Sequence, residues 1–132
     1  MVFAQKHHEE ERIAAITEKI IAAVIEVSNE LGIGFLEKVY ERAMLAELRR
    51  CGLKARAQAQ MPVSYKGELI GSYYADLLVE DEIIVELKCS TNFAPEHMAQ
   101  CLNYLKASGL KIALLINFGG ARARWKRVVH KL

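Results

Sequence analysis

The sequence lacks the features that mark secreted, membrane-spanning and zinc-binding proteins. Its three cysteines, Cys51, Cys89 and Cys101, are odd in number and have no C-x-x-C spacing, which argues for reduced thiols in a cytoplasmic setting. No apolar stretch approaches the roughly 20 residues that span a bilayer. The N-terminus turns at once to charged residues and lacks the apolar region of a signal peptide. We therefore expect a soluble cytoplasmic protein with no membrane partner.

Repeats, low-complexity segments and linkers are also missing. A chain of 132 residues that is 52% hydrophobic and 26% charged has the composition of an ordinary globular protein. The expectation is one domain over residues 1–132 with one core, large enough to need no disulfide.

The net charge of +2 is too small to indicate a partner. The basic residues are unevenly spread, however, because the last eleven residues contain no acid. That segment could meet phosphates, or it could be the solvated edge of a sheet. Its basic residues are Arg122, Arg124, Lys126, Arg127 and Lys131.

Three segments have helical periodicity. Apolar residues recur at steps of three and four from Ile13 to Leu31, which predicts an amphipathic helix of about twenty residues that stops at Gly32. A second helix is predicted from Leu36 to Leu48, and a third from Ala94 to Ser108. The first third of the chain is thus a helical hairpin.

The remaining segments have strand character. From about Met61, short runs rich in valine, isoleucine and tyrosine predict three antiparallel strands, separated by turns at Lys66-Gly67 and at residues 80–82. Residues 110–117 form an apolar run typical of a buried strand, and a basic strand follows Gly119-Gly120. The order predicts an α/β fold, a mixed sheet with helices packed on it.

The hairpin from Tyr73 to Lys88 carries the candidate chemistry. If its turn is the three residues 80–82, Asp76 lies directly opposite Glu86, on the same face of the pair. Lys88 joins that face because side chains alternate along a strand. The opposite face is apolar, and Leu78 and Ile84 make the charged face partly apolar too, which indicates a hairpin covered on both sides. The residues of the apolar face are Leu77, Val79, Ile83, Val85 and Leu87.

Two carboxylates held this close in a partly desolvated place require a cation or a shared proton. Mg²⁺ suits them because it takes oxygen ligands and keeps positions for water and a substrate phosphate. Lys88 could then hold or activate the attacking water and offset charge on a phosphate. The alternative is a salt-bridged cluster in which Lys88 neutralises Asp76 and Glu86 on a solvent-facing sheet.

The spacing of Tyr74-Ala75-Asp76 and Glu86-Leu87-Lys88 resembles the Asp, Glu-x-Lys signature of the PD-(D/E)XK nuclease superfamily. Residues 34–40, GFLEKVY, resemble the motif of the GxxExxY family, a small prokaryotic branch of it. Gln100 and Tyr104 resemble the Q-x-x-x-Y element of recombination-type exonucleases, and residues 114–119 resemble the closing strand of the GxxExxY family. The resemblance extends from about Ile13 to Val129.

That resemblance implies a restriction-endonuclease-like core, preceded by the helical hairpin, and a nuclease that depends on Mg²⁺ or Mn²⁺. It implies that Asp76 and Glu86 ligate the metal, that the Leu87 carbonyl can add to them, and that Lys88 is catalytic. Glu37 would reach the centre from its helix as a ligand or as a partner of one. The glycines before that helix would let it approach the sheet, although Glu37 could instead only pair with neighbours on its helix.

Other residues could contact the substrate. In the third helix His97, Gln100 and Tyr104 share one stripe, which would be free to line the cleft if the apolar stripe of Met98, Cys101, Leu102 and Leu105 packs on the sheet. Gln100 and Tyr104 could bind a phosphate or nucleotide, or be a surface amide and an aromatic at the edge of the core. Arg124, Lys126 and Arg127 would contact the nucleic-acid backbone without reading sequence.

A metal-dependent nuclease is therefore the leading hypothesis, with nucleic acid as partner, DNA ahead of RNA. A catalytically silent module of the same fold, which binds nucleic acid or a protein, is the alternative. A purely structural fragment of a larger assembly is a third. The apolar flanks of the first helix at Ile20 and Ile21 would also allow a homodimer.

Overall fold

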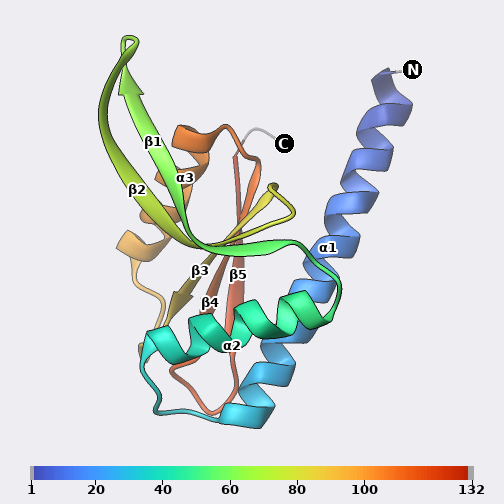
Figure 1. Cartoon of the computed structure of the whole chain (residues 1–132), viewed down its shortest axis with the longest axis vertical. Coiled ribbons are helices and arrows are strands. Elements are labelled where there is room, and N and C mark those ends of the chain that lie inside the picture. The colour runs from blue at the N-terminus through green and yellow to red at the C-terminus, as the bar shows by residue number, and fades with distance from the viewer. Residues whose placement is uncertain (1, 131–132) are drawn as a thin grey trace.

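The computed structural model describes residues 2–130 and contains one five-stranded sheet with three helices (Figure 1). The strand order is β1-β2-β3-β4-β5, antiparallel except for the parallel pair β3–β4, which α3 connects. The elements are α1 (Val2–Leu31), α2 (Glu37–Arg50), β1 (Ala55–Tyr65), β2 (Glu68–Val79), β3 (Ile83–Lys88), α3 (Pro95–Ser108), β4 (Ile112–Asn117) and β5 (Arg124–Val129).

The central strands are covered on both faces, as the sequence predicted. On one face Leu77, Val85 and Leu114 pack in a core with residues of α1 and α2. On the other face Leu78 and Ile84 pack with residues of α3. Figure 1 shows α2 crossing one side of the sheet while α3 lies on the other. Burial on both faces explains why these strands read as nearly continuous apolar runs.

The predicted order of elements is confirmed, but two boundaries differ. Helix α1 begins at Val2, about ten residues before its apolar stripe, because the polar residues there are good helix formers that need no core contact. Strand β1 begins at Ala55, six residues before Met61. Its first half alternates alanine with polar residues, and because alanine is depleted in strands, this pattern does not indicate a strand.

The hairpin of β1 and β2 is much longer than the rest of the sheet. We call residues 60–74 of this hairpin the arm. The seven residues Glu68–Tyr74 are all exposed, and Figure 1 shows the arm standing away from the other strands. The hairpin residues on either side of Asp76 pack on opposite faces of the sheet. Leu77 packs with α1 and α2, whereas Ala75 packs with α3. The bend between Ala75 and Leu77 falls at Asp76.

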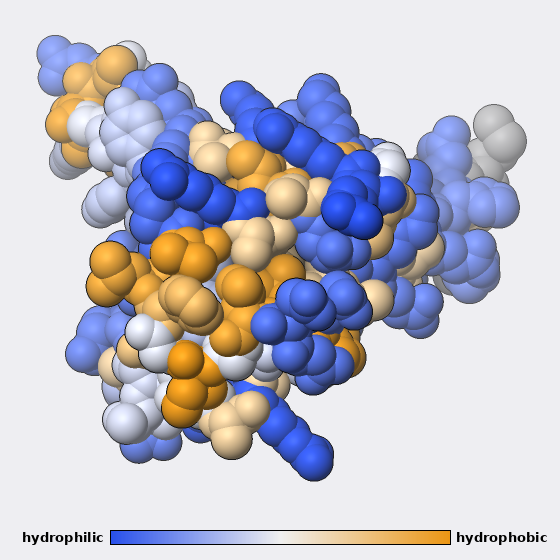
Figure 2. Space-filling view, turned by 60° about the horizontal axis from the view of Figure 1, so that its bottom comes forward, coloured by the Kyte–Doolittle hydropathy of each residue, from blue (hydrophilic) through white to orange (hydrophobic). Residues whose placement is uncertain are grey.

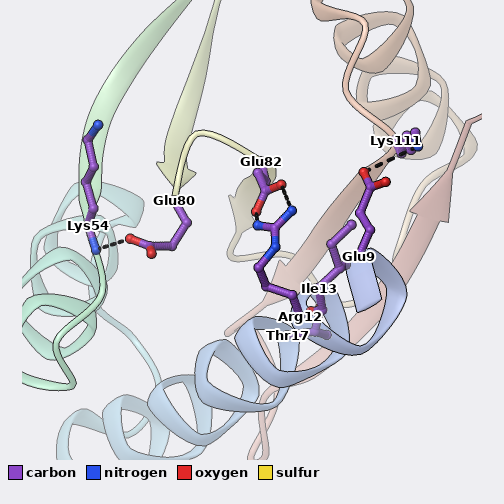
Figure 3. Close-up of polar contacts among 8 residues, drawn as sticks. All are labelled: Glu9, Arg12, Ile13, Thr17, Lys54, Glu80, Glu82 and Lys111. Atoms are coloured by element: carbon purple, nitrogen blue, oxygen red, sulfur yellow. Dashed lines mark hydrogen bonds and ion pairs between the residues drawn. The ribbon is translucent and has the colours of Figure 1, made fainter. Parts of the chain in front are cut away.

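Ion pairs and hydrogen bonds connect α1, and Lys54 just before β1, to the turn between β2 and β3 and to the residue before β4 (Figure 3). Arg12 makes a bidentate pair with Glu82 in the β2–β3 turn, and Glu9 lies 3.4 Å from Lys111 before β4. The backbone amide of Lys54 donates to Glu80 at 2.6 Å. The predicted three-residue turn at 80–82 is thereby held from both sides, which sets the register of β2 against β3.

Three further expectations concern a membrane, a homodimer and the basic segment. No helix among residues 2–130 has the length and apolar character to cross a membrane. Of the two flanks of α1 considered for a homodimer, Ile20 is fully buried in the core and Ile21 is half-buried. Lys131 of the basic segment lies outside the described residues.

A tight backbone contact holds the loop after β3. Asn117 accepts hydrogen bonds at its Oδ1 from the amides of Ser90, at 3.1 Å, and Gly119, at 2.8 Å. A Cβ on Gly119 would lie 2.2 Å from the carbonyl oxygen of Ser90. Only glycine therefore fits where the loops after β3 and β4 meet.

We predict that Gly119→Ala destabilises the protein by roughly 2 kcal/mol or more, because backbone atoms must move to make room. Gly120→Ala is the matched control, since its Cβ would meet its nearest neighbour at 3.5 Å, an ordinary contact. The free energies of unfolding in urea measure both. Equal stabilities of the two variants would contradict this account of the loop.

Candidate active site

Two crossed hydrogen bonds hold the candidate carboxylates side by side. The backbone amide of Asp76 donates to Glu86 Oε1 at 2.8 Å, and the backbone amide of Leu87 donates to Asp76 Oδ2 at 2.8 Å. The register of Leu77 opposite Val85 continues to place Asp76 opposite Glu86. Each acid thus bonds to the backbone of the opposite strand, where β2 and β3 stop forming regular pairs.

Lys88 lies two residues beyond Glu86 and is half-buried at the end of β3. None of the ion pairs among residues 2–130 joins it to Asp76 or Glu86. Its charge nevertheless acts on both, because it lowers the pKa of each carboxyl against the stronger effect of burial. The salt-bridged cluster considered from the sequence does not describe this arrangement, and the ammonium group is left available for a ligand.

The two carboxyls are electrostatically strained. Burial, more than any charge, raises the pKa of Glu86, and the neighbouring Asp76 carboxylate raises it further. Burial also raises the pKa of Asp76, against the hydrogen bond from Leu87 that lowers it. Glu86 is 3% exposed, so water cannot relieve the repulsion. Without a cation, the pair is best satisfied when it shares a proton.

Glu37 begins α2 and faces the same space as Asp76. Both line a cavity of about 220 Å³, and the charge of Glu37 contributes to the raised pKa of Asp76. The start of α2 is held by Tyr40, whose hydroxyl donates to the Gly32 carbonyl at 2.5 Å and whose ring stacks on Phe118, 4.5 Å between centroids. The tyrosine of the predicted motif therefore helps to place Glu37 at the site.

Two residues at this cavity were not identified from the sequence. Glu41 is buried, and its carboxylate accepts from Lys38 Nζ at 2.7 Å and from Gln58 Nε2 at 2.5 Å. Gln58 has a φ of 53°, rare for a residue other than glycine, at the point of β1 opposite Asp76. The i,i+4 spacing of Glu37 and Glu41 was a signal that both acids share one helix face.

The chemistry of the acids fits a hard divalent cation. Asp76 and Glu86 each use one oxygen to accept a backbone amide, so the crossed bonds hold the two carboxyls rigidly, and their mutual repulsion favours a positive ion between them. Within residues 2–130 no three histidine, cysteine or acidic side chains cluster at metal-ligand spacing. The predicted ligand roles of Glu37 and of the Leu87 carbonyl stay predictions.

Helix α3 packs on the sheet with its apolar stripe, as expected, and also with Tyr104. Tyr104 is 4% exposed and packs in the core, and Cys101 lies with it. Burial raises the pKa of both groups to about 12, and the charge of Glu86 adds to the effect in each. Gln100 is half-buried one turn earlier. His97 accepts from the Ala94 amide at 3.3 Å and caps the helix.

The three predicted backbone contacts do not share one surface. Arg124 donates to the Thr91 carbonyl at 2.7 Å, and both Arg124 and Lys126 lie over the ring of Phe93, in the loop that follows Lys88. Arg127 points to the opposite face of β5, where it lines a cavity with residues of α1. The structure brings Arg124 and Lys126 to the end of β3 and separates Arg127 from them.

Asn117 is a further residue that the sequence analysis did not single out. It pairs with Lys88 in the β3–β4 register and is fully buried. Its Nδ2 has no hydrogen-bond partner in the described part of the chain, while its Oδ1 accepts two amides. A lone asparagine at the end of an apolar run was the available signal, because a buried amide there needs a structural or functional reason.

The fold is of the restriction-endonuclease-like α/β class, and Asp76 and Glu86 lie on its central hairpin. The sequence model of the PD-(D/E)XK nuclease superfamily matches residues 14–128, and the chain belongs to that superfamily.

The chain is also similar to solved structures in its fold. The structure of SSO0001 is similar with a TM-score of 0.54 and 16% identity over 72% of this chain, which spans 50% of that one. An alkaline exonuclease from Laribacter hongkongensis has a TM-score of 0.49 and 11% identity, with 87% of this chain and 82% of that chain covered. No curated protein matches significantly. At these identities, the similarity to SSO0001 supports the fold alone.

The raised pKa of Glu86 predicts a pH-dependent stability. The folded protein keeps the proton of Glu86 up to about pH 8, whereas the ordinary value is 4.5. Between these values the folded state binds more protons than the unfolded state, so the free energy of unfolding falls as pH rises, by on the order of a few kcal/mol. Glu86→Gln, which cannot ionise, should flatten that decline in metal-free buffer.

Urea unfolding between about pH 5 and pH 9 in the presence of a chelator measures the effect. Glu96→Gln, in the exposed first turn of α3, is the control and should keep the wild-type slope. A Glu86→Gln profile parallel to that of the wild type would show that the Glu86 carboxyl is not held in its neutral form.

Proposed function

We propose that the chain is a Mg²⁺- or Mn²⁺-dependent nuclease whose centre is formed by Asp76, Glu86 and Lys88. The observation that supports this most strongly is the crossed pair of hydrogen bonds, which holds two partly desolvated carboxyls together next to an unpaired lysine. Such a pair costs stability unless it binds a cation, and an arrangement that costs stability indicates a functional site.

In this proposal Asp76 and Glu86 hold the cation, with the Leu87 carbonyl as a further ligand. The cation, when bound, polarises the phosphate and makes a coordinated water more acidic. Lys88 orients the water and offsets negative charge that develops on the phosphate. Glu37, across the cavity, completes the acidic environment. The chemistry is hydrolysis of a phosphodiester by in-line attack of water.

The substrate contacts follow from the surroundings of the centre. Tyr104 packs beside the centre from α3, Gln100 is proposed to reach the substrate from the same helix, and Arg124 and Lys126 lie beside the loop after Lys88, where they can bind phosphates. Contacts of this kind position a strand without reading its sequence. DNA is the substrate we propose ahead of RNA. The GFLEKVY segment further supports a place in the GxxExxY branch, and the whole chain is proposed to act as one domain.

Cleavage of labelled DNA and RNA with Mg²⁺ or Mn²⁺ tests the proposal. Lys88→Ala and Asp76→Ala should each lower the rate by about 100-fold or more, because each removes a group that acts in the transition state, and a chelator should abolish cleavage. Lys19→Ala, an exposed lysine on α1, is the matched control and should keep the wild-type rate.

Two outcomes would contradict the proposed centre. If the two substitutions left the rate unchanged, the activity would reside elsewhere. If the wild type cleaved no substrate while it still bound oligonucleotides, the catalytically silent module would replace the nuclease.

A further inference from the structure

A groove separates the arm from helix α3. It has a volume of about 610 Å³ and is lined by Pro62–Ser64 and Tyr73 of the arm and by Asn103, Lys106 and Ala107 of α3. Figure 1 shows the arm standing beside α3, on the side of the sheet that α3 covers. A two-stranded arm without a third strand is only marginally stable in water, so its length beyond the sheet indicates a use in binding.

One residue of the groove contacts the core beside the candidate centre. The ring of Tyr73 lies 5.2 Å from the ring of Tyr104, tilted by 56°. Tyr104 in turn packs in the core cluster that contains Ala75, the residue before Asp76. Two aromatic rings thus connect the groove with the core beside Asp76.

The lining offers the groups that bind an unpaired nucleotide. Tyr73 is 44% exposed, so its ring has a free surface on which a base can stack. Lys106 supplies a cation for a phosphate, and Asn103 supplies an amide that can bond a base edge or a sugar. The volume suits roughly one or two nucleotides of a single strand.

Resting on the proposed function, we infer that this groove binds single-stranded nucleic acid that extends from the cleaved phosphodiester. The strand stacks a base on Tyr73 and places a phosphate near Lys106. Ile33, Phe35 and Leu36, just before α2, are also exposed, and Figure 2 shows apolar atoms on the surface of this end of the molecule; nothing among the described residues indicates what covers them.

The structure provides an internal comparison for the test. Tyr74 is the next residue of the arm and is similarly exposed, at 54%, but it points to the opposite face because side chains alternate along a strand. Tyr73→Phe keeps the ring and loses only the hydroxyl. Together with Tyr73→Ala, these variants separate the loss of a stacking surface from a general weakening of the arm.

The experiment measures binding of labelled single-stranded oligonucleotides of increasing length by fluorescence anisotropy, in a chelator so that nothing is cut. We expect the affinity of the wild type to rise with length until the groove is filled. Tyr73→Ala should weaken the longer strands about tenfold or more, Lys106→Ala severalfold, and Tyr73→Phe and Tyr74→Ala less than about twofold. A duplex should compete poorly.

Three results would overturn the inference: binding that neither Tyr73→Ala nor Lys106→Ala weakens, a loss caused by Tyr74→Ala in place of Tyr73→Ala, or equal affinity for duplex and single strand. The two proposals fail separately. Cleavage that depends on Lys88, with binding insensitive to Tyr73, would contradict the groove alone. Binding that depends on Tyr73, without any cleavage, would contradict the nuclease alone.

Discussion

The repulsion between the buried carboxyl of Glu86 and the half-buried carboxyl of Asp76 is the constraint around which the rest of the site is arranged. Asp76 and Glu86 lie side by side because each accepts a hydrogen bond from the backbone of the opposite strand. Burial strengthens their repulsion, and the apolar layers on both faces of the sheet keep water away from Glu86 in particular. This arrangement lowers the stability of the folded protein, and a bound cation would restore part of that stability.

The strands separate at the same place, with a cavity on one side of the sheet and a groove on the other. At Asp76 the hairpin bends, and β1 and β2 leave the sheet to form the arm. On one side of the bend, Glu37 and Glu41 of α2 close a cavity with Gln58. On the other side, α3 and the arm enclose the groove. One interruption in the β-ladder therefore lies between the acidic pocket and the groove.

The sequence was sufficient for the fold and for the central hairpin. A three-residue turn at 80–82 determines by counting that Asp76 meets Glu86, and apolar residues on both faces indicate a covered sheet. The contact of Glu41 with Gln58 could not be predicted, because it joins two elements whose distance depends on how α2 packs. The left-handed backbone at Gln58 has no local signal, since glycine or asparagine would be expected there.

The central claim is that the carboxyl pair binds a divalent cation in exchange for its proton. Calorimetric titration with Mn²⁺ near neutral pH, in buffers of different ionisation enthalpy, measures both the binding and the protons released. The account predicts binding accompanied by proton release, with both lost in Asp76→Ala. Absence of binding, or binding that releases no proton and survives Asp76→Ala, would contradict it.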